Sequence, residues 1–369
     1  MISQARKRAR EAGRHGGGPD QQEKIDFYRA MQVAMSGVIA YAQNLSGKAE
    51  AMAGQTDDQV QRKHFYRLAD TCASVPAKPA ETFLEAVNAL WLCNVGILAE
   101  NVNMAVSPGR LDQVLYPFFR RDVEKGRINV EDALNIIGCL WFKIADNTNL
   151  VPASAEKLFG GAGSVPAVTV GGVDQEGGDA VNDLTYLMLK VTELLKLRDP
   201  NVNARYHLDV NDRTYKERMS RVIINTRAIP AIYSDTAIIP ALENQGLSTA
   251  HARDYGVVGC VEPTSAGREY ADTSAIILNL TAAMDMALHR GKRPYLTGDL
   301  QIGPETPAVE DLASFEDFRD VFEQQLAALI DMAVSLDGEL ELQHRQLLPS
   351  PLLSCFFRGP LENGRDLIS

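Results

Sequence analysis

The chain contains little cysteine: five residues, odd in number and widely spread, with no Cys-x-x-Cys pair. This scarcity argues against a disulfide framework and a structural zinc site, and it favours a reducing compartment. No stretch of about twenty uninterrupted apolar residues occurs, so the sequence predicts no membrane span. The basic residues 1–14 lack the apolar segment of a secretory signal. We therefore expect a cytoplasmic location.

The chain also lacks an excess of positive charge. It carries 37 basic against 48 acidic groups, a net charge of −11. This balance argues against nucleic-acid binding and against binding to anionic membranes. The three glycines at 16–18 are not a phosphate loop, because no Gly-Lys-Ser/Thr follows them and no apolar strand precedes them.

Hydrophobic periodicity divides the chain into three parts. Residues 1–22 are polar and end at the glycine run, which predicts a flexible segment. Residues 23–160 repeat apolar side chains at helical spacing and predict a mainly helical part. In residues 161–369 short apolar runs alternate with amphipathic segments, which is typical of α/β folds with parallel strands. In such folds functional side chains lie at the strand ends.

The strongest functional signal is the segment Gly259-Cys260-Val261-Glu262-Pro263, which follows an apolar run. In an extended segment residues i and i+2 face the same side, so we expect Cys260 and Glu262 to point into one enclosed pocket. A plain buried thiol is the alternative, because free cysteine is among the most buried residue types. A buried carboxylate, however, is costly without a purpose.

Two other types of site are less well supported at this segment. A cysteine hydrolase needs a histidine to form the thiolate, and none of the six histidines lies in a motif that recommends it. A metal site needs more sulfur or imidazole ligands than the segment offers.

The Gly-Cys-Val-Glu-Pro segment resembles the catalytic-cysteine motif of the glycyl radical enzymes, the pyruvate formate-lyase-like family. It is similar to the branch with one cysteine followed by Val-Glu, which contains dehydratases, lyases, decarboxylases and succinate-adding synthases. Three further blocks resemble the family in the same order, from about residue 24 to the end of the chain. These are Ser107–Gln113 with Tyr116-Pro117, Val168–Asp174 with Asn182–Tyr186, and Asp199–Asn201 with Arg205–His207.

The resemblance implies an α/β barrel of ten strands, made from two half-barrels and surrounded by helices. It also implies a backbone glycyl radical, on a loop near the C-terminus, that oxidises the cysteine to a thiyl radical. Cys260 would then be the thiyl radical that abstracts hydrogen from a small organic substrate, and Glu262 the nearby acid or base. Ser107, Arg110, Thr273 and Ser274 would bind substrate.

The resemblance also implies partners. An activating enzyme with S-adenosylmethionine and an iron–sulfur cluster would install the radical, and no metal or organic cofactor would be bound by this chain. The family commonly forms homodimers.

Two departures from the family pattern change these expectations. No glycyl-loop motif follows Cys260, and the opening part of the barrel is also missing. We therefore expect a partial barrel without the glycyl radical domain: a central fragment, a truncated reading frame or one piece of a split enzyme, inactive without a complementary chain. Diol dehydratases carry Gly-Trp-His-Asp after the cysteine, whereas this chain has Ser274 at the acid's place, or Asp272 with a gap. This disfavours glycerol or propanediol dehydration, and Thr273 or Ser274 could equally cap a helix.

Three functions remain open. The first is a glycyl-radical lyase or synthase that acts through Cys260. The second is a non-catalytic partial barrel, or a subunit that contributes the cysteine loop to a partner chain. The third is a cysteine hydrolase.

Overall fold

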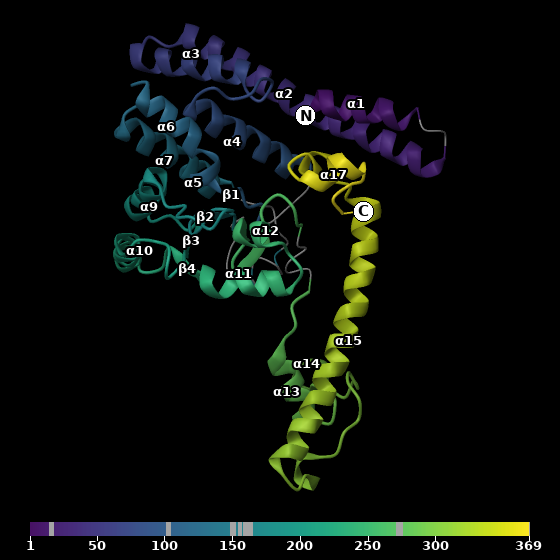
Figure 1. Cartoon of the computed structure of the whole chain (residues 1–369). Helices are drawn as coiled ribbons and strands as arrows, with labels where there is room; N and C mark the ends of the chain where they lie inside the picture. Colours follow the sequence, from purple (N-terminus) through teal and green to yellow (C-terminus); the bar gives the residue numbers. More distant parts are fainter. Residues whose placement is uncertain are drawn as a thin grey trace. The chain divides into compact units, whose positions relative to one another are not determined.

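The computed structural model describes residues 1–14, 18–100, 105–147, 153, 157, 165–270 and 276–368. The chain divides into two compact units (Figure 1). The first unit comprises Met1–Tyr270 and Ser350–Leu367, and the second comprises Ala271–Pro349 with the last two residues.

The first unit begins with helices. They are α1 (Ile2–Ala12), α2 (Pro19–Gln55), α3 (Gln59–Ser74), α4 (Phe83–Glu100), α5 (Leu111–Val114), α6 (Tyr116–Glu124) and α7 (Val130–Asp146). The start of α7 follows from its sequence, because Asn129 and Asp132 form a reciprocal capping box. Two short helices, α16 (Pro351–Ser354) and α17 (Arg358–Asn363), complete this unit.

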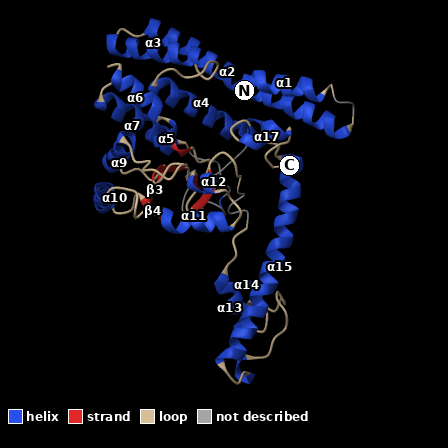
Figure 2. Cartoon of the chain, in the orientation of Figure 1, coloured by secondary structure: helices blue, strands red, loops and turns tan. Residues whose placement is uncertain are grey.

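A four-stranded parallel sheet follows, in the order β1-β2-β3-β4. Its strands are β1 (Gly109–Arg110), β2 (Ala167–Gly171), β3 (Asn201–Tyr206) and β4 (Ala231–Ser234). The helices that connect or follow these strands are α9 (Asp183–Leu195), α10 (Arg213–Thr226), α11 (Asp235–Asn244) and α12 (Thr249–Arg253). Figure 2 shows the strands as a small central part of this unit, with helices around them. Last comes an antiparallel hairpin of β5 (Tyr255–Val258) and β6 (Glu262–Ser265).

The main core of this unit lies between the sheet and its helices. Apolar residues of β2 and β3 pack there against α4 to α7, α9 and α10. Trp141 is fully buried in this core, and its indole Nε1 donates to Thr192 Oγ1 at 3.1 Å. The polar end of the ring is therefore satisfied inside the core.

The helix α4 has the length and composition of a membrane span within the described parts of the chain. The sequence predicted no such segment. Five of its residues, among them Phe83 and Leu92, are buried in clusters shared with other helices of the unit. Length and composition alone are weak evidence here, since the core helix of a globular protein passes the same test.

The second unit is helical. It contains α13 (Leu280–Leu288), α14 (Pro294–Thr297), a 3₁₀ turn η1 (Val309–Asp311) and the long helix α15 (Phe315–Leu347). Figure 1 shows α13 beside the first part of α15. Ser314 and Asp317 form a capping box that starts α15.

Three boundaries differ from the sequence prediction. Residues 2–12 of the predicted flexible segment form α1, because Ala5 packs with Tyr28 and Met31 of α2. The sequence predicts one strand-and-helix core over 161–369, whereas the last strand among the described residues ends at Ser265 and Ala271–Pro349 belong to the second, helical unit. Helical spacing in the sequence also predicts a helix over 274–290, and in the structure this helix begins only at Leu280, where Asn279 caps it.

Candidate active site: the Cys260 turn

Cys260 lies at the tip of the β5–β6 hairpin. Val258 pairs with Glu262, so Gly259, Cys260 and Val261 form a three-residue turn. Gly259 has φ +59°, a left-handed conformation that glycine adopts without strain. The prediction of one extended segment through Cys260 and Glu262 was therefore wrong, because the chain reverses direction between them.

Glu262 nevertheless lies at the cysteine, through the backbone of the turn. Its Oε2 accepts hydrogen bonds from the amide of Cys260 at 3.1 Å and from that of Val261 at 2.8 Å. Hydrogen bonds from two backbone amides to one charged carboxylate are stronger than bonds between neutral groups, so they restrain the local backbone. One carboxylate oxygen thus fixes the turn that carries the thiol.

Ser107 ties this turn to the sheet. Its Oγ accepts from the amide of Gly259 at 3.1 Å and from that of Ala167 at 2.9 Å, and it donates to the carbonyl of Ala105. The hydroxyl of Ser107 therefore forms hydrogen bonds with the backbone of the turn and with the backbone of β2. Substrate binding by Ser107 stays a prediction.

Two side chains of the sheet hold the carbonyl of Cys260. Asn201, the first residue of β3, donates from Nδ2 to the carbonyls of Gly259 and Cys260, each at 3.1 Å. Tyr233 of β4 donates from its hydroxyl to the same Cys260 carbonyl, also at 3.1 Å. Sequence analysis assigned no role to either residue, although Asn201 lies within a segment that resembles the family.

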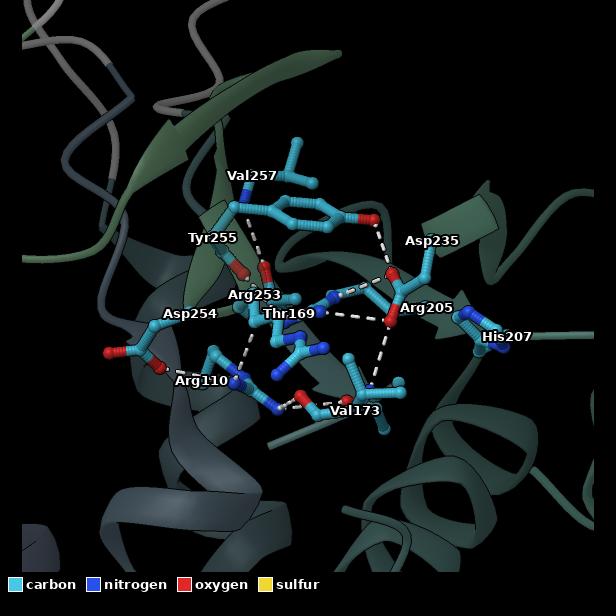
Figure 3. Close-up of polar contacts among 12 residues, drawn as sticks. Arg110, Thr169, Val173, Arg205, His207, Asp235, Arg253, Asp254, Tyr255 and Val257 are labelled. Carbon is cyan, nitrogen blue, oxygen red and sulfur yellow. Dashed lines mark hydrogen bonds and ion pairs between the residues drawn. The ribbon is translucent and has the colours of Figure 1, made fainter. Parts of the chain in front are cut away.

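A buried ion pair anchors the base of the hairpin (Figure 3). Arg205 and Asp235 are both fully buried and join through two bonds of 2.9 Å. The hydroxyl of Tyr255 donates to Asp235 at 2.7 Å, and the Arg205 guanidinium lies 3.9 Å from the centre of the Tyr255 ring. Arg205 also donates to the carbonyls of Arg253 and Tyr255. The ion pair therefore connects β3 and α11 to the first residue of β5.

Arg110 makes a second connection to the hairpin base. Its guanidinium is 4% exposed; it donates to the carbonyls of Gly171 and Val173 and pairs with Asp254 at 3.0 Å. Burial is the main cause that lowers the pKa of Arg110, followed by the nearby charge of Arg205. These contacts give the side chain a structural role, and substrate binding by Arg110 stays a prediction.

Backbone contacts complete the anchor. The amide of Val257 in β5 donates to Thr169 Oγ1 in β2 at 2.8 Å (Figure 3). Gly256 lies against Gly109 and Thr169, where a Cβ atom would have 3.6 Å to each. The hairpin is thus held against β1 and β2 by its stem and against β3 and β4 by its tip.

The thiol of Cys260 is not enclosed by the described residues. Cys260 is exposed, which differs from the expected closed pocket, because the turn is contacted from the side of the sheet and of Ser107. Partial desolvation still raises the pKa of the Cys260 thiol, and the charges of Glu262 and Asp199 raise this pKa further. The sulfur therefore favours its protonated S–H form.

The remaining predicted site residues, Thr273 and Ser274, lie outside the described residues, as does Asp272. Of the six residues predicted for the site, the structure brings together Cys260, Glu262 and Ser107 at the turn. It places Arg110 at the hairpin base.

Comparison with known proteins identifies the family. The sequence model of the family described as "Pyruvate formate lyase-like" matches residues 1–369. The isethionate sulfite-lyase of Nitratidesulfovibrio vulgaris is 32% identical over 308 residues, which are 83% of this chain and 37% of that protein. The (2S)-3-sulfopropanediol dehydratase of Klebsiella oxytoca is 30% identical over 95% of this chain and 42% of its own length. The chain thus spans about two fifths of the length of these curated relatives.

Solved structures agree with this assignment. A glycyl radical enzyme from Archaeoglobus fulgidus superposes with a TM-score of 0.92 at 32% identity, and the match covers 100% of this chain and 46% of that one. The predicted α/β barrel architecture is thereby confirmed at the level of the fold. Sequence, fold and relatives agree that this chain belongs to the pyruvate formate lyase-like family, and that its relatives are glycyl radical enzymes.

Proposed function

We propose that this chain carries the cysteine part of a glycyl-radical lyase or dehydratase, in which Cys260 transfers hydrogen atoms and Glu262 handles protons. The observation that supports this most is the turn itself. A single thiol stands at the tip of a hairpin whose backbone is fixed by a carboxylate and by two strands of the sheet. A thiol that only fills a core needs no such support.

The protonation state of the sulfur favours hydrogen-atom chemistry over nucleophilic chemistry. A nucleophilic cysteine needs a lowered pKa and a base beside it. Here the pKa of Cys260 is raised, and the groups that hydrogen-bond to the turn within the described residues include no histidine. We therefore favour the radical function over the cysteine hydrolase.

The proposed chemistry is a hydrogen shuttle. In glycyl radical enzymes a backbone glycyl radical, installed by a radical-SAM activating enzyme, supplies the oxidising equivalent. Cys260 loses the hydrogen atom of its S–H bond and, as a thiyl radical, takes one from a substrate C–H bond. The S–H bond forms again and a carbon radical remains. After a neighbouring group departs, the product radical takes the hydrogen atom back from Cys260, and the thiyl radical is restored.

Glu262 suits a proton-handling role because its two oxygens are used differently. Oε2 is occupied by two amides of the turn, whereas Oε1 has no hydrogen-bond partner among the described residues. We propose that Oε1 accepts the proton of a substrate hydroxyl as the carbon radical rearranges.

The substrate and partners that we propose follow from the relatives. Two of them are named for isethionate and for (2S)-3-sulfopropanediol, so we propose a small polar organic substrate. We further propose a radical-SAM activating enzyme as partner, a cytoplasmic location, a homodimer, and either a continuous chain or a complementary chain that supplies the glycyl loop.

The test is a comparison of conditions. The complete enzyme that contains this segment is activated anaerobically and offered isethionate and (2S)-3-sulfopropanediol. The unactivated enzyme is offered simple esters in air. We expect product only after activation and its loss on exposure to air. Ester hydrolysis in air that depends on Cys260 would instead support the hydrolase, and absence of product from both substrates and from the esters would favour a non-catalytic barrel.

A further inference from the structure

The tip of the hairpin has only a short stretch of backbone to define the direction of the thiol. The turn contains Gly259, Cys260 and Val261, and its first residue is a glycine with positive φ. A glycine there adds conformational freedom in the absence of other restraints. The direction of the Cys260 side chain therefore depends on the side chains that hydrogen-bond to the turn. Glu262 and Ser107 hold its amides, which leaves the carbonyl of Cys260 to be held by other groups.

Two donors from neighbouring strands converge on one acceptor at this point. The carbonyl oxygen of Cys260 receives Asn201 Nδ2 from β3 and Tyr233 Oη from β4, both at 3.1 Å. Tyr233 is 9% exposed, so its hydroxyl is held on the sheet rather than free in solvent. Both lone pairs of that carbonyl are used, which fixes the peptide plane that follows Cys260.

We propose that Asn201 and Tyr233 form a carbonyl clamp that positions Cys260, so that its sulfur keeps one direction relative to the substrate during hydrogen transfer. The proposal rests on the proposed function. Neither residue need touch substrate: both act through the peptide of the cysteine and are positioning residues.

The physical reason for such a clamp is the short range of hydrogen transfer. Reacting atoms must be held near contact distance, and a displacement of about 1 Å costs on the order of 100-fold in rate. A three-residue turn with a glycine cannot supply this precision from its own backbone. Hydrogen-bond donors on two adjacent strands of a parallel sheet can supply it.

The first test measures the turn without any radical chemistry. Tyr233→Phe removes one oxygen atom, and Asn201→Leu keeps the side-chain size without the donor. Iodoacetamide alkylation of Cys260 is followed against pH by mass spectrometry of its peptide, with Cys139 on α7 as the internal reference. Tyr206→Phe is the matched control, because it makes the same change at the far end of β3.

We expect release of the clamp to increase hydration of the thiol, which is only partly desolvated in the structure. The carboxyl groups of Glu262 and Asp199 and the phenol of Tyr233 are the titratable groups that interact with the thiol. Because burial is the largest cause of its raised pKa, more hydration moves the alkylation profile to lower pH. Each variant loses at least one hydrogen bond to the turn, which raises the population of the displaced turn several-fold. We therefore expect alkylation at pH 8 to become about 3- to 10-fold faster in each variant.

Hydrogen exchange gives an independent measure. The amides of Gly259, Cys260 and Val261 should exchange faster in both variants, because the clamp holds two carbonyls of the same turn. An unchanged Cys260 profile and unchanged exchange in both variants, with Cys139 also unchanged, would overturn the proposal. If Asn201→Leu changes the alkylation of both Cys260 and Cys139, the variant has unfolded. The result for Tyr233→Phe then decides whether the proposal holds.

The second test uses the activated complete enzyme. Tyr233→Phe should lower kcat by roughly 10- to 100-fold and leave KM within about twofold, because substrate contacts are kept. A roughly 10- to 100-fold loss of kcat/KM that comes from a higher KM, with kcat unchanged, would contradict a positioning role. Failure of the proposed function is distinguishable: turnover that persists in a Cys260→Ser variant would refute the radical role of Cys260 and leave the alkylation and exchange results standing.

Discussion

A hydrogen-atom carrier must keep its hydrogen, and the surroundings of Cys260 favour that state. Desolvation and the charges of Glu262 and Asp199 all act against the thiolate and raise the thiol pKa. At a given pH below this raised pKa, a smaller share of the sulfur is deprotonated than in an unperturbed cysteine.

This electrostatic argument predicts the effect of removing one carboxylate. Glu262→Gln takes away a negative charge beside the thiol, so the pKa of Cys260 should fall and its thiolate fraction at pH 8 should rise. We expect alkylation at pH 8 to become about 3- to 10-fold faster, because a larger share of the sulfur is then thiolate.

The measurement is the pH profile of Cys260 alkylation, with the exposed Cys139 of α7 as the reference in the same molecule. A slower reaction in Glu262→Gln, at an unchanged Cys139 rate, would show that Glu262 does not act on the thiol by its charge.

At the scale of residues, the sequence pattern indicates Cys260 and Glu262 but not the side chains that hydrogen-bond to their turn. Asn201 and Tyr233 lie 59 and 27 positions before Cys260, and no local pattern connects them to it. Such contacts depend on the order of strands in the sheet. For Ser107, the segment that resembles the family indicated importance, while the structure assigns it a hydrogen-bonding role toward the backbone.

At the scale of elements, the anchor of the hairpin depends on the buried pair Arg205–Asp235. A buried charge that loses its partner costs far more than an exposed one. Asp235→Asn should therefore lower the free energy of unfolding by about 3–5 kcal/mol, measured by denaturant titration.

The matched control is Glu217→Gln. Glu217 pairs with Arg213 on α10, and their side chains are 56% and 85% exposed. Its removal should change the free energy of unfolding by less than about 0.5 kcal/mol. Equal effects of the two acid-to-amide changes would refute the anchor.

The glycine turn after β2 supports the same anchor by making room for it. Gly172 has φ +76°, and a Cβ atom there would lie 2.6 Å from Asp235 Oδ2 and 2.7 Å from Arg205 Cβ. Gly172→Ala should thus destabilise the protein by at least about 2 kcal/mol, through the strained backbone and the displaced ion pair.

Gly138→Ala is the opposite case in the same unit. Gly138 lies within α7, and the nearest atom to an added Cβ is Leu195 Cδ1 at 4.0 Å. Because alanine favours helix over glycine by about 1 kcal/mol, this change should be neutral or stabilising. Thermal unfolding of the two variants measures the direction of each change in stability. A Gly172→Ala variant as stable as the parent would contradict the close packing around Gly172.

The order of elements could largely be predicted, because periodicity and capping residues are local signals. The alternation of strands and helices from β2 to β5 follows the sequence pattern. The hairpin turn could not be predicted in this way, because the apolar run before Cys260 does not mark where the chain reverses. Nor did composition reveal α1, whose burial of Ala5 depends on packing with α2.

At the scale of the whole molecule, the chain carries the cysteine hairpin on a parallel sheet. It spans about two fifths of the length of its curated relatives. The described residues leave Cys260 exposed, and Thr273 and Ser274 lie outside them. Turnover is therefore tested on the complete enzyme that we propose, and stability and thiol reactivity are tested on this chain.

The central claim is that the sulfur of Cys260 carries the hydrogen atom, and replacing that one atom tests it most directly. In the activated complete enzyme, Cys260→Ser keeps the turn but substitutes an O–H bond for the weaker S–H bond. We predict that product formation falls by at least about 1000-fold, equivalent to about 4 kcal/mol of barrier, while the electron-spin signal of the glycyl radical stays at the parental level. Product formation within tenfold of the parent, at the same radical signal, would contradict the account.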